Sequence, residues 1–372
     1  MILIKLNLPF NLSRRLDLRN KSLTSPFELN LIKNSYLNTE QSHFRQASSI
    51  NNISKAQYIS GLTQSDGSFF CSIEKVIKKD KSKGLTFTPI FDLTADLDSK
   101  HALDLIQNYF CCGSVSINYK DSTARYRVIN RADLINIIIP HFKAYPVFFN
   151  KLHAFNLFIQ ILEHLSLKPK DRDLKEILKL SVSMNTSSRR TDDEIKKLCD
   201  ILDISPVTKI PDKTLKLTSE LTAGFLSGMI DGDGSFNISF PQNLETGKIK
   251  PVLSICIGPT SLPFIEEFKK YLGPSGTLEK SKNILVLKIT NLNHLIDYVI
   301  PFVESNLMIT EKKEHYNIWK KVCFILKRDK LLSKEALLEI VELAYNMNKG
   351  GKRRKINKRQ YIEIVNKYSS ND

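Results

Sequence analysis

The chain contains one sequence pattern twice. Residues 58–70 read YISGLTQSDGSFF, and residues 225–237 read FLSGMIDGDGSFN. Aligning the two segments places Asp66 on Asp233, an offset of 233 − 66 = 167. Self-similarity at a fixed spacing is the signature of a repeated structural unit, so it constrains the fold more than any local propensity does.

A second pair of matching segments lies further along the chain. IIPHF at 138–142 matches VIPFV at 299–303, at an offset of 299 − 138 = 161. At this offset three more pairs align, namely Arg127 with Lys288, Lys151 with Lys312, and Asn156 with Asn317. The change in offset is what a difference in loop length produces. The sequence therefore predicts two copies of one unit of about 110 residues.

Each copy has the same predicted order of elements. An apolar helix with small residues comes first, then strands, a helix, another strand and one or two final helices. In the first copy we expect these elements at 56–65, 68–76, 86–93, 99–109, 125–130 and from 132 onward. Phe236, Ile238 and Phe240 alternate with polar residues, and Phe69, Cys71 and Ile73 do the same in the first copy. Each sheet is therefore expected to bury one face and leave the other free.

The repeats divide the chain. We predict an N-terminal extension at 1–52, a first repeat at 53–165, a linker with helices at 166–222, a second repeat at 223–330 and a basic helical C-terminal extension at 331–372. The first residues are rich in Arg and Ser and poor in acids. That composition fits an organelle transit segment and equally a leftover upstream reading-frame extension.

The charge of the chain favours a polyanionic partner. It has 55 Lys and Arg against 39 Asp and Glu, a net charge of +16. Nucleic acid is the leading partner and an anionic membrane surface the competitor, while Lys-rich coding bias alone would give the same excess. No apolar run approaches the length of a membrane-spanning helix. The six cysteines form no C-x-x-C pair and have no His cluster at zinc spacing, so we expect them to be reduced.

The repeated motif predicts two closely packed helices. A Ser-Gly pair within each motif allows a partner helix to approach, and the second copy supplies that partner. Each helix is expected to end at the glycine after its last acid, Gly67 or Gly234. Asp66 and Asp233 would then lie side by side at two helix C-termini.

Two carboxylates at two helix C-termini require cations, because a helix C-terminus carries partial negative charge. Mg²⁺ fits, as do Mn²⁺ and Ca²⁺, since such hard ions take carboxylate and carbonyl oxygens. We expect Asp66 and Asp233 as metal ligands, joined by the carbonyls of Ser65 and Gly232. Such a site next to a basic sheet suits phosphodiester hydrolysis. A lone Asp-Gly more often marks a turn, but two copies in the same context weaken that alternative.

The paired segments resemble the two motifs of LAGLIDADG homing endonucleases, of the single-chain type encoded in organellar introns. The resemblance covers roughly residues 53–330 and extends to IIPHF, VIPFV and the NMNKG at 346–350. It implies an α+β fold of two tandem αββαββα repeats, which form a pseudo-twofold pair of saddle-shaped antiparallel sheets. It also implies that Asp66 and Asp233 bind the catalytic metals. By register it implies catalytic roles for Lys151 and Lys312, whose alternative is an ordinary solvated helix start.

The resemblance implies a function as well. The expected activity is a double-strand break by metal-dependent hydrolysis at a long asymmetric DNA target, which promotes intron homing in a mitochondrion. The expected partner is double-stranded DNA. The chain is expected to act as a monomer and not to associate with a membrane. Gln64 stands where the motif has an Asp, kept as Asp231 in the second copy, and we expect this inner position to be structural. Ala95 and Ile257 stand where some members have a polar Gln, a departure that weakens the expectation of cleavage.

The polar sheet faces are the expected DNA surface, because a two-stranded ribbon fits the major groove. Strands of eight to ten residues span about 30 Å, or about nine base pairs per half. Arg suits guanine edges and Asn suits adenine. An ordinary solvated sheet face is the alternative for each candidate. The candidates are Ser68, Ser72, Glu74, Arg125, Arg127, Ser235, Asn237, Ser239 and Lys288.

Two other functions remain open at this point. The chain could be an RNA maturase that assists splicing of a group I intron through its basic surface. It could also be a cleavage-dead DNA-binding protein, although it keeps both Asp66 and Asp233. Whether the two acids are needed separates the endonuclease from the maturase.

Overall fold

The computed structural model describes most of the chain after its N-terminal segment. The described ranges are residues 52–77, 81–185, 190–211, 220–258, 262–281, 284–329, 331–348 and 354–368. The predicted N-terminal extension, apart from residue 52, lies outside these ranges, as does part of the basic C-terminal segment. No helix in the described ranges has both the length and the apolar character that a bilayer crossing requires.

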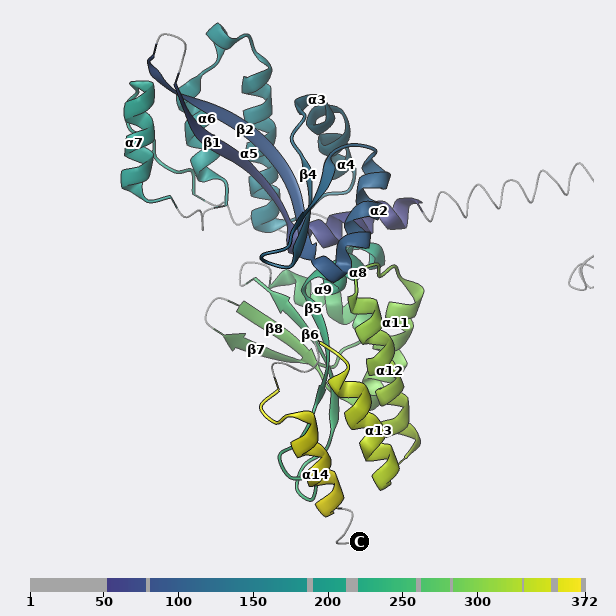
Figure 1. Cartoon of the computed structure of the whole chain (residues 1–372). Coiled ribbons are helices and arrows are strands. Elements are labelled where there is room, and N and C mark those ends of the chain that lie inside the picture. The colour runs from purple at the N-terminus through teal and green to yellow at the C-terminus, as the bar shows by residue number, and fades with distance from the viewer. Residues whose placement is uncertain are drawn as a thin grey trace, which may run out of the picture. The chain divides into compact units, whose positions relative to one another are not determined.

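Two four-stranded antiparallel sheets form the framework, with strand orders β1-β2-β4-β3 and β5-β6-β8-β7 (Figure 1). The identical order confirms the predicted α+β architecture of two tandem repeats. The strands are β1 (Gly67–Ile77), β2 (Lys83–Asp96), β3 (Ser114–Asn118), β4 (Thr123–Val128), β5 (Gly234–Ser239), β6 (Lys250–Ile257), β7 (Thr277–Ser281) and β8 (Ile284–Ile289).

Helices precede, cover and follow each sheet. A helix over residues 52–66, called here the first motif helix, leads directly into β1. The others are α2 (Lys100–Phe110), α3 (Arg131–Asp133), α4 (Ile139–Ala144), α5 (Phe149–Ser166), α6 (Leu174–Ser183), α7 (Asp192–Leu202), α8 (Ala223–Asp233), α9 (Pro263–Leu272), α10 (Leu292–His294), α11 (Ile300–Ser305), α12 (Lys312–Arg328), α13 (Lys334–Tyr345) and α14 (Lys358–Tyr368). Short 3₁₀ turns lie at Leu97–Ser99 and Pro169–Asp171, and π-helical turns at Leu134–Ile138 and Leu295–Val299.

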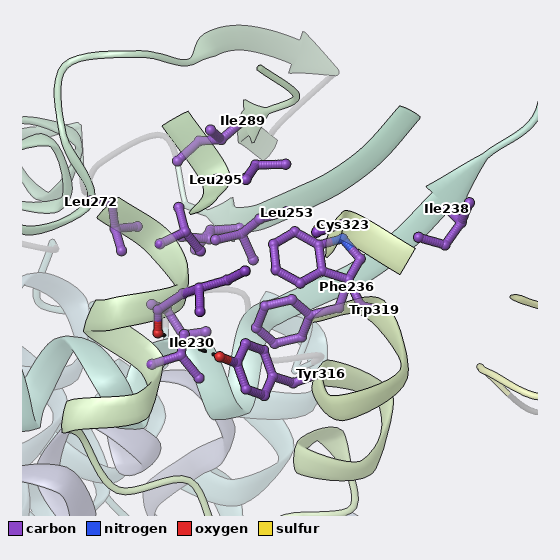
Figure 2. Packing of buried hydrophobic residues seen from close by; sticks show 14 of the residues in the cluster. Ile230, Phe236, Ile238, Leu253, Leu272, Ile289, Leu295, Tyr316, Trp319 and Cys323 are labelled. Carbon is purple, nitrogen blue, oxygen red and sulfur yellow. Dashed lines mark hydrogen bonds between the residues drawn. The ribbon is translucent and has the colours of Figure 1, made fainter. Parts of the chain in front are cut away.

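Each sheet buries one face, as the alternation predicts. In the first repeat, Phe69 of β1 packs against the rings of Phe91, Phe142 and Phe155, with ring centroids 5.0–5.1 Å away. In the second repeat, Phe236 of β5 lies 5.3 Å from the Tyr316 ring and 5.2 Å from the Trp319 ring. Figure 2 shows this cluster between β5 and α12. Full burial of each such side chain contributes about 1.5–3 kcal/mol to folding.

The two cores exchange residues. Phe148 and Phe149, from the first copy, lie in the core of the second, where the Phe149 ring is 4.9 Å from that of Phe264. In return, Leu307 and Ile309 of the second copy pack against the first core. The exchanged segments occupy equivalent positions, since 148 + 161 = 309. Each copy therefore completes the other's hydrophobic core.

The helices outside the predicted repeats also match one another. Helices α6 and α7 lie in the segment at 166–222, and α13 lies in the segment at 331–372 for which a basic helical extension is predicted. Asn185 follows α6 and Asn348 follows α13, and both have left-handed φ angles, 52° and 50°. The Asn185 amide donates to the Phe69 carbonyl at 3.0 Å, and the Asn348 amide donates to the Phe236 carbonyl at 2.9 Å. The internal symmetry thus continues past the units of about 110 residues.

Two elements, β3 and α14, were not found from their own residue patterns, although the αββαββα order implied by the resemblance includes β3. Strand β3 reads SVSIN at a sheet edge, where Val115 and Ile117 are only half-buried and give a weak apolar signal. Helix α14 follows a basic, glycine-containing segment that resembles a chain end more than a helix start. All six cysteines are free, with Cys71, Cys199 and Cys323 buried.

Candidate active site

The first motif helix and α8 touch through glycine. A Cβ on Gly61 would lie 1.9 Å from the Phe225 carbonyl oxygen, and one on Gly228 would lie 2.1 Å from the Tyr58 carbonyl oxygen. The two contacts are equivalent under the repeat, because 58 + 167 = 225. Only glycine permits this approach, which confirms the predicted small-residue contact between the helices.

The paired helices place two acids together. Asp66 is the last helical residue before Gly67, and Asp233 is the last residue of α8. Burial, and next the negative charge of Asp233, raise the pKa of Asp66 to about 6. Burial also raises the pKa of Asp233, against the opposing effect of a hydrogen bond from the Ser65 side chain. A Cβ on Gly232 would lie 3.0 Å from Asp66 Oδ2, so the glycine leaves room beside this carboxylate.

Two lysines reach the same helix ends. Lys151 lies in the first turn of α5, and its Nζ donates to the Gly67 carbonyl. Lys312 begins α12, and its Nζ donates to the Gly232 carbonyl at 2.5 Å. Burial lowers the pKa of both lysines, while the nearby carboxylates oppose that shift. Ammonium groups here offset the partial negative charge of two helix C-termini. The alternative of solvated helix starts does not fit these contacts.

The inner motif position is structural, as predicted. Asp231 accepts hydrogen bonds from the backbone N–H of Ile309 at 2.8 Å and of Thr310 at 3.1 Å, and from the Tyr58 and Thr310 hydroxyls. At the equivalent position Gln64 accepts one bond, from the Phe148 N–H at 2.8 Å. Both side chains hold the backbone just before Lys151 of α5 and Lys312 of α12. Gln64 therefore keeps the hydrogen bond from the backbone N–H, whereas the further bonds that Asp231 accepts from Thr310 and Tyr58 have no counterpart at Gln64.

The donor set next to the acids suits a hard cation. A cavity of about 320 Å³ is bordered by Asp66, Asp231, Gly232 and Lys312, together with Asp96 and Glu311. Among the described residues, no three His, Cys, Asp or Glu side chains converge as a complete metal cage. Asp66 borders this cavity, and Asp233 is not among its lining residues; as predicted ligands the two would supply two carboxylates, with the remaining oxygens coming from carbonyls, water and a phosphate substrate. Mg²⁺ commonly binds in this way, with few carboxylates and several other oxygens. The Gly232 carbonyl, a predicted ligand, accepts from Lys312 in this structure.

The predicted polar face of the first sheet exists. Ser68 and Ser72 alternate with the buried positions of β1, and Glu74 continues the same face beyond them. Ser68 pairs with Asp92, which pairs with Arg127. Arg127 Nη2 lies 3.1 Å from Asp92 Oδ2, and Arg125 Nε lies 3.7 Å from the same oxygen. Both arginines therefore share one face, and contact of this face with DNA stays a prediction.

The second sheet has a matching face of different composition. Ser235 pairs with Ser254, which pairs with Lys288, and Ser239 pairs with Lys250. Asn237 lies between the two serines, and Lys288 forms an ion pair with Glu279. Sequence reasoning missed the residues that β2, β3, β6 and β7 add to the two faces, although alternation along β2 and β6 could have found several. These residues are Thr86, Thr88, Asp92, Thr94, Ser114, Ser116, Lys250, Ser254, Thr277 and Glu279.

Comparison with known proteins gives a consistent result. A family model described as LAGLIDADG endonuclease matches residues 59–162 and 226–323, one match in each repeat. "Probable intron-encoded endonuclease 2" of Neurospora crassa is 28% identical over 298 residues, which are 77% of this chain and 63% of that protein. "Probable intron-encoded DNA endonuclease 1" of Mycosarcoma maydis is 23% identical over 265 residues, which are 69% of this chain and 95% of that protein.

Solved structures match across the same region. The I-SmaMI LAGLIDADG homing endonuclease bound to cleaved DNA has a TM-score of 0.69 at 25% identity, covering 79% of this chain and 97% of that one. I-SmaMI bound to an uncleaved DNA target in the presence of calcium ions has a TM-score of 0.66 at 25% identity, covering 79% of this chain and 98% of that one. The match includes both repeats and extends beyond them.

Proposed function

Because this chain belongs to the LAGLIDADG endonuclease family, we propose that it is a site-specific DNA endonuclease that makes double-strand breaks by metal-dependent phosphodiester hydrolysis. One observation carries the proposal. Asp66 and Asp233 lie at the ends of two touching helices, each beside a lysine bound to a helix-end carbonyl. The two sheet faces differ in composition, which favours a long target without exact symmetry. Cleavage at such a site would promote homing of the host intron.

The residues of the chain have separable tasks in this reaction. Asp66 and Asp233 would hold the divalent cations, with the Ser65 and Gly232 carbonyls as further candidate ligands. Bound cations supply positive charge that activates water and stabilises the attacking and leaving oxygens. Lys151 and Lys312 hold protons on ammonium groups beside the acids, where they attract a phosphate. The sheet faces orient the duplex, and candidate contacts on them include Arg127 and Lys288.

The finer assignments rest on chemistry and on relatives. Mg²⁺ is the proposed ion, because its preference for oxygen ligands fits the two carboxylates. The structure of a similar endonuclease, I-SmaMI, was solved in the presence of calcium ions. Intron-encoded relatives support an organellar location, which we propose to be the mitochondrion. A monomer is proposed because both motif helices come from one chain. Binding of group I intron RNA stays a separate prediction, based on the net charge of +16.

The test of this function replaces each acid by its amide. Asp66→Asn and Asp233→Asn each remove an anionic ligand with little change in shape, so each should abolish Mg²⁺-dependent double-strand cleavage. DNA binding should persist, because the groove contacts lie on the sheets. The measurement combines a cleavage selection from a randomised double-stranded DNA library with gel-shift assays of the selected target.

Asp104→Asn is the matched control, since Asp104 is a half-buried helical acid of α2 that pairs with Lys100 one turn away. It should cleave as the wild type does. Full cleavage by both active-site variants would overturn the catalytic assignment. Loss of binding would mean instead that these acids hold the helix interface together. Splicing assistance, if present, should survive in all three variants, which separates a maturase from the endonuclease.

A further inference from the structure

The C-terminal segment closes the outer edge of the second sheet. β5 is an edge strand, and its outward carbonyls would otherwise be open to pairing with another chain. Asn348 donates to the Phe236 carbonyl at 2.9 Å, and Arg354 donates to the Ile238 carbonyl at 2.8 Å. The Arg354 guanidinium also lies over the rings of Phe240 and Tyr345, at 4.8 and 5.0 Å.

One of these edge contacts reaches the candidate DNA face. Asn348 Nδ2 lies 2.9 Å from the Phe236 carbonyl oxygen and also 2.9 Å from Asn237 Oδ1. A backbone carbonyl can only accept, so the atom of Asn348 that faces it must be the donor nitrogen. The second hydrogen of that nitrogen then requires an acceptor, which fixes the oxygen of Asn237 toward Asn348. The Asn237 nitrogen faces the other way and donates to Ser235 Oγ at 2.8 Å.

The fixed amide retains a defined pair of groups. Asn237 has one Nδ2 hydrogen and one Oδ1 lone pair left, because each atom has used one of its two. A donor and an acceptor on one amide complement the N7 acceptor and N6 donor of adenine in the major groove. An amide free to rotate could instead present either group to several bases.

The first repeat has the same edge contact without this consequence. Asn185 donates to the Phe69 carbonyl at 3.0 Å. The residue equivalent to Asn237 is Phe70, since 237 − 167 = 70, and its ring carries no acceptor. Arg127 lies over that ring at 6.0 Å. Asn185 thus supports the strand edge alone.

We propose that Asn348 fixes the amide of Asn237 in one orientation and so sharpens the base preference at the DNA position that Asn237 faces. This inference rests on the proposed endonuclease function. Asn348 is a positioning residue, because it acts on DNA through another side chain. Base preference in one half-site therefore depends on a segment more than 100 residues away along the chain, as 348 − 237 = 111.

The experiment uses the full chain and a target recovered by cleavage selection from a randomised double-stranded DNA library. Cleavage rates are then measured on a panel that varies this target one base pair at a time. The test variant is Asn348→Gly and the matched control is Asn185→Gly. Glycine removes each amide and tolerates the left-handed φ of 50° or 52°, so the two variants add no backbone strain.

Asn348→Gly should reduce base discrimination at one position of one half-site by about threefold to tenfold, the effect of about one hydrogen bond. Asn185→Gly should lose a similar amount of thermal stability, but its base discrimination should not change at any single position of the DNA target. Asn237→Ala should lose preference at the same position as Asn348→Gly, and the double variant should match Asn237→Ala alone. If Asn348→Gly does not fold, Asn348→Asp takes its place, because Asp tolerates the same backbone and offers no N–H.

Three results would overturn the inference while leaving the proposed function intact. These are an unchanged profile in Asn348→Gly, an equal loss of rate on every target, and the same local change in Asn185→Gly. A wild-type chain that selects no target from the library would overturn the proposed function, and the inference with it. The two failures are therefore distinguishable from the wild-type result alone.

Discussion

At the scale of single residues, the site places two carboxylates close together, and their repulsion lowers the free energy of unfolding. Asp66, which is exposed, and Asp233, which is half-buried, lie at two helix ends that already carry partial negative charge. The ammonium groups of Lys151 and Lys312 offset part of this repulsion, yet the pKa of Asp66 stays raised at about 6. In the absence of metal, the ionised site therefore opposes folding.

This raised pKa predicts a pH dependence of stability. The folded chain keeps the Asp66 proton up to about pH 6, whereas the unfolded chain loses it near pH 3.8. The free energy of unfolding should thus fall as pH rises from about 4 to about 6, and then level off. Asp66→Asn should be more stable than wild type at pH 7, by less than the full pKa shift would give because solvent screens this exposed carboxylate, and should show no gain below pH 4.

Urea unfolding in EDTA between pH 4 and 8 measures this dependence, with Asp104→Asn as the control. An equal difference between Asp66→Asn and wild type at every pH would contradict the pKa assignment. Mg²⁺ at pH 7 should stabilise the wild type more than Asp66→Asn, since an ion that binds only the folded state adds to its stability.

Arg127 provides a second prediction at this scale. Its guanidinium lies 3.1 Å from the carboxylate of Asp92, a side chain only 9% exposed, so the arginine is held in place over the sheet. Arg127→Ala should relax base preference at one position and cost about 1–3 kcal/mol of binding there. Arg125→Ala is the comparison, because Arg125 is 47% exposed and lies 3.7 Å from Asp92. A uniform loss across all sequences would identify Arg127 as a phosphate contact.

At the scale of elements, the motif helices determine where the acids lie. Their separation is set by two reciprocal contacts of Gly61 and Gly228 with backbone atoms of the opposite helix. Backbone cannot move aside as a flexible side chain can, so the helices would have to separate to admit even a methyl group. Any such separation moves Asp66 away from Asp233.

Gly61→Ala and Gly228→Ala should therefore both destabilise the chain, despite the better helix propensity of Ala, which favours it by about 1 kcal/mol. Overpacking costs about 1–3 kcal/mol or more. Gly224→Ala, on α8 with Gly228, should cost less stability, because its Cβ would come no closer than 2.9 Å to another atom. Thermal unfolding and cleavage rates of the three variants test the order. A Gly61→Ala variant with full stability and activity would contradict the close contact.

At the scale of the whole molecule, the proposed DNA surface combines two polar sheet faces with a net charge of +16. Affinity should fall steeply with salt, because phosphate contacts release counterions. For about six to ten contacts the loss is roughly 10³- to 10⁵-fold between about 50 and 200 mM salt. Filter binding or fluorescence anisotropy across this range measures the slope. A nearly flat salt dependence of the affinity would contradict the proposal that both sheet faces bind DNA.

Much of this architecture could be predicted because the repeat fixes equivalences that single residues do not. Alternation placed Ser68 and Asn237 on polar faces, and the motif placed Asp66 and Asp233 at helix ends. The ion pair between Asp92 and Arg127 could not be identified, since the two residues are adjacent only after β2 and β4 pair. The link from Asn348 to Asn237 was also beyond reach, because it depends on how the chain turns after α13. Long-range register, rather than local pattern, determines both contacts.

The exchange of Phe148 and Phe149 for Leu307 and Ile309 between the two cores has an evolutionary consequence. Either repeat expressed alone would expose the apolar surface that the other repeat's side chains cover. A fused pair of such units is therefore expected to keep both copies. The copies remain free to diverge on their outer surfaces, where each meets its own stretch of substrate. Where the copies meet, a substitution in one copy must still fit the side chains of the other.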